Sequence, residues 1–464
     1  MGDRKRFFVL FSFYDKTRIE KYLEAKAQEG WLLEKMSAFG WRFKRIEPKK
    51  IKFFVSYFPK ASAFDPEMSD EQLNFNEFCE HTGWKLASSN AQIQIFYNEK
   101  ENPIPIETEA IVEVQTIHKA VKKSFLPVYF MDLFLGIMMS VMFISRYKND
   151  PISLLSSNAS LFSVICWINI IIMCSAELGR YYSWRKKALK QAENGGGFLE
   201  TKGTTGFQVI SLIFMIAALL FMLVSYGSSK MTAVYILSLL SICAITAFIV
   251  LLSSLMKKLK VKTGVNRIVT IIVTVVLSFG LTGIVIIKIL SAVNTVFPDN
   301  EAVGTYEYKG NTFKVYKDDI PLKIEDIAET DYDSYSYRLW NENESVFLKT
   351  YSAVQRPRMD ALNIPDLSYT VTEIKMSALY NLCKNAALED FAKNYSYYPS
   401  DYEFRKEAVE TDASIWGAES AYQLYMGGEK TDEYLVCFED KIVAFDFDWE
   451  ISGEQMKLCG EIFK

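Results

Sequence analysis

Histidine is scarce in this 464-residue chain, which has only two, His81 and His118. Neither lies in the C-terminal third, so a histidine-based catalytic or zinc centre is excluded there. Three of the seven cysteines fall in that part: Cys383, Cys437 and Cys459. Because spacing does not set connectivity, one disulfide with a free thiol and three reduced, buried cysteines are both open.

A cleavable signal peptide is also missing from the sequence. The start, MGDRKRFFVLFSF, has an apolar run that is too short and is followed too soon by Asp15 and Lys16. It is not a myristoylation site, because the sixth residue is Arg6 rather than Ser or Thr. The glycine-rich stretch ENGGGFLETKGTTG lacks the Gly-Lys-Ser/Thr ending of a phosphate loop, which favours a flexible connection.

Long apolar runs are plentiful in the middle of the chain and rare on either side of it. Each run is close to the ~20 residues that a helix needs to cross a bilayer, and none has the polar face of a buried soluble helix. The sequence therefore predicts a transmembrane region over about 125–290, whose first helix directs insertion. The predicted spans are 125–144, 160–178, 207–226, 232–256 and 268–288.

The basic residues between these spans are unevenly distributed. The loop after the first predicted span contains only Arg146 and Lys148, and the loop after the third contains only Lys230. The other loops and the segment before the first span are strongly basic. By the positive-inside rule the basic segments are cytoplasmic, which predicts a cytoplasmic N-terminus and an extracytoplasmic C-terminus. The basic residues are Lys119, Lys122, Lys123, Arg180, Arg185, Lys186, Lys187, Lys190, Lys257, Lys258, Lys260, Lys262 and Arg267.

Two polar stretches near the N-terminus predict helices that end in Gly-Trp. KTRIEKYLEAKAQEG has Thr17 and Glu20 at capping-box spacing, and SDEQLNFNEFCEHTG has Ser69 and Gln72 at the same spacing. Both stretches end in glycine, the residue that best adopts the left-handed conformation at a helix C-terminus. Alternating, strand-like sequence follows each helix.

The order of these elements predicts a fold for residues 1–101. FFVLFSF is read as a first strand, so the series is strand, helix, two strands, helix, two strands. That series is typical of an α+β ferredoxin-like domain, here placed in the cytoplasm. A linker follows over 102–124, and the prolines in its NPIPIE start favour extended chain.

Three tryptophans of this region, Trp31, Trp41 and Trp84, have two interpretations. Large aromatic side chains dominate core packing, so they can cover the seam between helices and sheet. They can also line a groove that binds a partner or an apolar ligand. Basic residues alternate with aromatic ones here, as in proteins that bind single-stranded nucleic acid, but the nearly neutral charge of the region argues against nucleic acid.

The pattern of KYLEAKAQEGWLLEK, an aromatic strand pair and FCEHTGWKLASSNAQIQIFY resembles the bacterial family catalogued as domain of unknown function 2812. The resemblance covers about residues 6–100, with an echo in YKDDIPLKIEDI. It implies a small cytoplasmic domain followed by membrane spans in a bacterial cell membrane. Members are often encoded beside transcription regulators, which implies a stress or signalling context. The family brings no reaction and no catalytic residues.

Polar residues inside predicted spans are candidates for function. Asp132 can bind a cation or proton, or it can accept hydrogen bonds from a neighbouring helix through Ser211 or Ser241. Glu177 and Arg180 lie together at the cytoplasmic end of the second span.

The C-terminal segment 298–464 has about twice as many acidic as basic residues, which favours cations or basic partners. Its pattern predicts an extracytoplasmic α+β domain with hairpins that turn at 309–311 and 439–441. SALYNLCKNAALEDF predicts a helix, and SGEQMKLCGEIFK predicts a closing helix capped by Ser452.

Three carboxylates of this domain, Asp446, Asp448 and Glu450, alternate along one strand. They are weak candidates for a metal site, because carboxylates on a solvated strand face are common and the spacing of a calcium loop is absent.

Three classes of function remain open. The favoured one is a non-enzymatic sensor or adaptor that couples a cytoplasmic binding domain to an external domain. The alternatives are a transporter or export-associated subunit and an external hydrolase. We expect no cofactor and no nucleic acid, and we expect the lipid bilayer and a cytoplasmic regulatory protein as partners.

Overall fold

The computed structural model describes nine ranges of the chain and divides it into two compact units. The described ranges are 3–37, 40–107, 109–201, 203, 205–225, 230–296, 302–361, 364–393 and 405–464. The first unit comprises 1–139, 166–220 and 231–288, and the second comprises 140–165, 221–230 and 289–464. Two predicted boundaries, Tyr226 and Pro298, lie outside the described residues.

The N-terminal region contains one supersecondary unit twice. Each copy is a strand, a helix and two more strands, and in each the third strand lies between the other two in an antiparallel sheet, with orders β1-β3-β2 and β4-β6-β5. The first copy consists of β1 (Arg4–Phe7), α1 (Lys16–Gln28), β2 (Trp31–Lys35) and β3 (Trp41–Arg45). The second consists of β4 (Lys52–Tyr57), α2 (Asp70–His81), β5 (Lys85–Asn90) and β6 (Ile93–Asn98).

The predicted ferredoxin-like sheet is not confirmed, because these strands pair into two sheets of three. The alternation in WLLEKMSAFGWRFKRI predicts one strand, but the stretch forms two, β2 and β3. Gly40 has φ +96°, a conformation that a strand residue does not adopt, and the Ser37 hydroxyl donates to the Gly40 carbonyl at 2.6 Å. The predicted first strand is also displaced, since β1 ends at Phe7 and the rest of FFVLFSF has no strand structure.

The glycines that precede Trp31 and Trp84 behave as the sequence predicts. Gly30 and Gly83 have φ +85° and +89°, so both helices end in a left-handed residue. A Cβ atom at Gly30 would lie 2.9 Å from the Ile46 carbonyl oxygen, so a side chain there would also clash.

The two predicted capping boxes have different outcomes. The box of Ser69 and Gln72 is confirmed at the start of α2. The box of Thr17 and Glu20 is wrong, because the N-cap of α1 is Asp15, two residues before Thr17. The Thr17 hydroxyl instead accepts a hydrogen bond from the Thr201 N–H at 3.0 Å.

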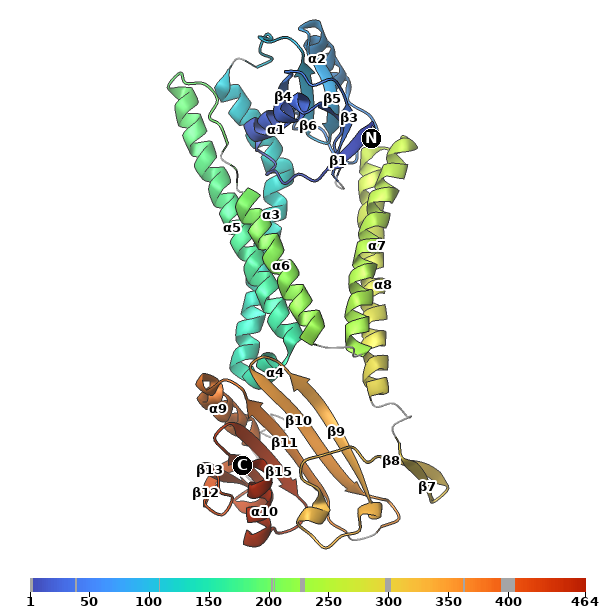
Figure 1. The fold of residues 1–464 in the computed structure, drawn as a ribbon, viewed down its shortest axis with the longest axis vertical. Coiled ribbons are helices and arrows are strands. Elements are labelled where there is room, and N and C mark those ends of the chain that lie inside the picture. The colour runs from blue at the N-terminus through green and yellow to red at the C-terminus, as the bar shows by residue number, and fades with distance from the viewer. Residues whose placement is uncertain are drawn as a thin grey trace. The chain divides into compact units, whose positions relative to one another are not determined.

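Five helices in the described residues are long and apolar enough to cross a membrane, which confirms the predicted number of candidate spans. They are α3 (Ala110–Asn149), α5 (Asn158–Glu193), α6 (Thr205–Ser225), α7 (Lys230–Lys258) and α8 (Thr263–Val296). Helix α3, the long helix that follows the N-terminal region in Figure 1, begins at Ala110, well before the predicted span that starts at residue 125. Its first turns bury Val114, Ile117 and Val121 in the N-terminal core, so most of the segment predicted as a linker is helix.

The C-terminal region is built on one antiparallel sheet of seven strands in the order β12-β13-β14-β15-β11-β10-β9. A separate hairpin, β7 (Gly304–Tyr308) with β8 (Asn311–Val315), precedes it. The sheet strands are β9 (Tyr335–Glu344), β10 (Leu348–Pro357), β11 (Leu367–Ile374), β12 (Lys406–Thr411), β13 (Ser420–Met426), β14 (Glu429–Cys437) and β15 (Lys441–Phe447). The helices are α4 (Pro151–Ser156), α9 (Tyr380–Phe391) and α10 (Gly453–Phe463).

Both faces of this sheet are covered, because neighbouring residues of each strand point to opposite sides. Val443 belongs to a cluster with Phe463 of α10, whereas Ile442 belongs to a cluster with Cys383 of α9. Both predicted hairpins, both predicted helices and the Ser452 cap are confirmed.

Candidate functional site

A buried turn between β1 and α1 is the centre of the site in the first unit. The Asp15 side chain has no exposed surface and accepts hydrogen bonds from the Ser12 N–H at 3.1 Å and from the Arg18 guanidinium at 2.8 Å. The Arg180 guanidinium of α5 lies 3.8 Å from its other oxygen. Burial raises the pKa of the Asp15 carboxyl, while the Ser12 N–H and the two arginines oppose that rise.

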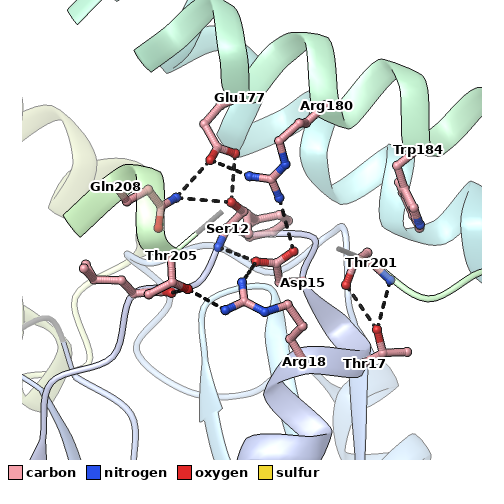
Figure 2. A network of polar contacts seen from close by, with 12 residues as sticks. Ser12, Asp15, Thr17, Arg18, Glu177, Arg180, Trp184, Thr201, Thr205 and Gln208 are labelled. Carbon is pink, nitrogen blue, oxygen red and sulfur yellow. Dashed lines mark hydrogen bonds and ion pairs between the residues drawn. The ribbon is translucent and has the colours of Figure 1, made fainter. Parts of the chain in front are cut away.

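Glu177 links this turn to two apolar helices (Figure 2). Its carboxylate, in a residue that is 2 % exposed, accepts hydrogen bonds from the Ser12 hydroxyl at 2.8 Å and from the Gln208 amide of α6 at 2.9 Å. The Arg180 guanidinium donates to it at 2.9 Å. One carboxylate on α5 therefore joins the N-terminal region, α5 and α6.

A second buried ionic cluster fixes the start of α3. The Lys16 ammonium donates to Glu113 and lies 3.5 Å from the Oε1 atom of Glu20. That oxygen also accepts a hydrogen bond from the Val55 N–H at 2.9 Å. The ammonium also lies 3.9 Å from the centre of the Phe54 ring, a cation–π contact. Burial raises the pKa of Glu20 to about 7, and the Lys16 charge opposes this rise.

Aromatic rings pack around the same junction. Tyr14 is almost fully buried, and its ring centre lies 5.1 Å from that of Tyr181, 5.5 Å from that of Trp184 and 5.9 Å from that of Phe125. Tyr181 shares a hydrogen bond of 2.6 Å with His118. A residue of the N-terminal region is thus wedged between α3 and α5.

Two loops between apolar helices also contact the N-terminal region. The segment after α5 contacts α1, and the turn between α7 and α8 contacts the chain before α2. The contacts are Lys21 with Glu200 at 2.7 Å, Thr17 with Thr201 at 3.0 Å, Lys260 with Glu67 at 2.6 Å and Thr263 with Asp65 at 2.8 Å.

In the second unit, α4 packs on the C-terminal sheet beside α9 and β10 (Figure 1). Ile152 and Leu155 pack against the cluster that contains Cys383. The Ser345 hydroxyl donates to the Leu155 carbonyl at 2.6 Å. The Asn158 amide at the start of α5 donates to the Glu344 carbonyl at 2.9 Å. The connection between α3 and α5 is therefore part of the C-terminal domain core.

The structure brings Glu177 and Arg180 together but leaves Asp132 elsewhere. Asp132 is half-buried on α3. The serines expected as its donors bond differently, since Ser211 donates to Asn169 at 2.7 Å and Ser241 to a carbonyl of its own helix. Neither hydroxyl therefore supplies the expected hydrogen bond to Asp132, and a cation or proton role for Asp132 stays a prediction.

The three tryptophans do not form one groove. Trp84 is 4 % exposed and lies in a cluster with Cys79, while its indole N–H donates to the Ile104 carbonyl at 2.8 Å. Trp31 and Trp41 are half-buried and pack against a different cluster.

The candidate metal carboxylates Asp446, Asp448 and Glu450 are exposed on one face of β15 and the residues after it. Asp448 accepts the Asp366 N–H at 2.7 Å. Among the described residues, no three of the His, Cys, Asp and Glu side chains gather as a metal site would require. All seven cysteines are free, so the structure has the reduced form of the two alternatives.

Sequence reasoning missed Ser12, Asp15, Lys16 and Gln208 as members of a site. Asp15 and Lys16 carried one signal, since they interrupt an apolar run directly before a helix. Their burial depends on α3 and α5, which lie far away in the sequence.

The five candidate spans, with β-rich regions at both ends of the chain, indicate a multi-span membrane protein. Residues 15–129 match the family described as Protein of unknown function (DUF2812), which confirms the resemblance. The match begins at the buried Asp15 and ends within α3, so it includes both ionic residues that hold the start of α3, Lys16 and Glu113. Neither a curated protein nor a solved structure gives a match.

Proposed function

We propose that the chain is a membrane sensor or adaptor, in which α3 and α5 couple a cytoplasmic binding domain to an external domain. The observation that carries this proposal is that each helix has one end in each compact unit. The first turns of α3 belong to the N-terminal core, and its last residues lead into α4, which belongs to the C-terminal core.

The contacts of the loops support opposite sides for the two domains. The loops that follow α5 and α7 contact the N-terminal region, whereas the loop that follows α3 packs in the C-terminal region. Loops of a helical bundle alternate between the two sides of a membrane. The loops that contact the N-terminal region are also the basic ones, which is the cytoplasmic character under the positive-inside rule.

The coupling step needs a rigid connection between the domains. Helix α3 has 40 residues, so it spans about 60 Å at the usual rise of an α-helix. Its inner end is held by Glu113 and by buried apolar side chains, and its outer end continues into α4. A ligand that moved α4 on the sheet would therefore displace a helix that is anchored in the inner domain.

A cytoplasmic regulatory protein is the partner that we propose for the N-terminal domain. Trp31 keeps part of its ring exposed, with the Arg45 guanidinium 5.0 Å from the ring centre. On α2, Leu73 and Phe78 are 47 % and 55 % exposed. Aromatic and arginine side chains are enriched where proteins bind one another.

Cysteine labelling tests the sidedness. In a variant with Cys243 replaced by Ser, Glu80→Cys on α2 and Lys430→Cys on β14 each place one thiol at an exposed position. We expect a membrane-impermeant maleimide to label Lys430→Cys in intact cells, and to label Glu80→Cys only after the membrane is opened. Labelling of both thiols in intact cells would refute the proposed arrangement.

Site-specific photo-crosslinking tests the partner. A photoreactive amino acid at position 31 should give a protein adduct in living cells, whereas the same residue at position 84, which is buried, should not. Adducts at position 31 with envelope or transport proteins alone would count against a cytoplasmic regulatory partner.

A further inference from the structure

Helix α5 presents an exposed stripe that runs from its apolar part into its basic end. The spacing of three and four residues keeps these positions on one helix face. Two isoleucines at the apolar end are about half exposed, which is expected of side chains that face lipid. The stripe consists of Ile168, Ile172, Ser175, Gly179, Ser183 and Lys187.

The basic end of the stripe opens into a cavity of about 470 Å³ within the first unit. Tyr14 and Trp184 contribute aromatic rings to its lining, and Arg180 and Lys187 contribute cations. A Cβ atom at Gly179 would have no neighbour within 4 Å, so bare backbone faces open space there. This volume is in the range of small-molecule sites in general, which is roughly 300–1,000 Å³.

The depth of the cavity matches a lipid headgroup. The second predicted span ends at about residue 178, directly before Gly179. Side chains one or two turns further along the helix therefore lie at the level of the headgroups, where tryptophan, tyrosine and basic residues gather.

The charges around the cavity favour a phosphate group. Arg180 pairs with Glu177 and Asp15, and its guanidinium lines the cavity as a cation. Among the residues that the structure describes, Lys187 takes part in no ion pair. The acid on the rim, Glu200, is paired with Lys21.

We propose that this cavity binds a glycerophospholipid of the inner leaflet. The phosphodiester lies between Arg180 and Lys187, the glycerol crosses Gly179 and Ser183, and the acyl chains follow Ile168 and Ile172. The small residues of the stripe would also suit a second copy of this chain. The cavity and its two cations favour the lipid, because close helix packing needs neither.

Native mass spectrometry of the full-length protein in detergent tests this proposal, with dioleoyl phosphatidylglycerol as the probe. We expect one tightly retained lipid per chain. Lys187→Gln should weaken its retention about tenfold, because a charge-assisted contact to phosphate is lost. Gly179→Leu should abolish retention by filling the cavity. The control Lys190→Gln alters an exposed lysine outside the cavity and should retain the lipid as the parent protein does.

Three results would overturn the proposal, provided that the variants keep the helix content of the parent protein. The first is equal lipid retention in Lys187→Gln and Lys190→Gln. The second is displacement of the lipid by millimolar inorganic phosphate or glycerol phosphate, which would identify a soluble phosphate ligand. The third is a dimer that Gly179→Leu dissociates, which would assign the stripe to a second copy of the chain.

Discussion

The two ends of α3, which we call inner and outer after the arrangement proposed above, are held by different kinds of interaction. At the inner end, a lysine and two glutamates lie in a buried cluster, and a second network of buried charges surrounds Asp15. At the outer end, α4 is held by apolar contacts and by a hydrogen bond from the Ser345 hydroxyl to the Leu155 carbonyl. The inner junction should therefore respond to charge and pH, and the outer junction to packing.

The largest effect should come from breaking the inner cluster with Lys16→Met. The change leaves Glu20 and Glu113 buried without their cation, which costs about 3–5 kcal/mol in comparable buried pairs. We expect this loss in the stability of the N-terminal region, measured by hydrogen exchange of α1 and β4 amides in the full-length protein.

The control for this change is Lys21→Met on the same helix. Lys21 pairs with Glu200 at the surface, where both side chains are more than half exposed, and exposed pairs contribute about 0–1 kcal/mol. Equal losses in the two variants would contradict the importance that we assign to the buried cluster.

At the outer junction, Ser345→Ala should cost about 1–3 kcal/mol. The partly buried Leu155 carbonyl loses its hydroxyl donor, and the N–H groups of Phe347 and Leu348 lose an acceptor. The expected result is faster hydrogen exchange in α4 and β10. The control Ser352→Ala alters an exposed hydroxyl of β10 and should change hydrogen exchange little. If both serine variants behaved alike, the contact with α4 would not be important for stability.

The smallest expected effect is a pH dependence that is confined to the inner region. Glu20 has a folded-state pKa of about 7, above the ordinary value near 4.5, so the folded state keeps a proton that the unfolded state releases. The stability of α1 should therefore fall by about 2 kcal/mol between pH 5 and pH 7 and be level above that range.

Hydrogen exchange of α1, corrected for its intrinsic pH dependence, measures this change. Glu20→Gln should remove the dependence. The control is Asp366→Asn, since burial raises the pKa of Asp366 to about 6 as well. Asp366 belongs to the other compact unit, so this change should leave the pH dependence of α1 unaltered. A pH dependence of α1 that survived Glu20→Gln would assign the titration to another group.

The parts that sequence predicted well are those with local signals. Five apolar runs, the Ser69 capping box, the Ser452 cap and both C-terminal hairpins depend on neighbouring residues, and all are confirmed. The Thr17 box failed because Thr201, 184 positions later, uses the same hydroxyl. The pairing of the N-terminal strands into two sheets was not predicted, because residues distant in sequence decide which strands meet.

The candidate site also has residues that sequence could predict and residues that it could not. Glu177 stood out because charged residues within a membrane span are rare, and Arg180 follows it by one helical turn. Asp15 and Lys16 resemble ordinary surface residues, and only the packing of α3 and α5 against α1 buries them.

The most direct test of coupling is to disturb the outer junction and measure the inner one. In the full-length protein in lipid nanodiscs, Ser345→Ala should speed hydrogen exchange in α4 and also in the first turns of α3, residues 110–124, whereas Ser352→Ala should change neither. Faster exchange in α4 with unchanged exchange in residues 110–124 would contradict the proposal that α3 couples the two domains.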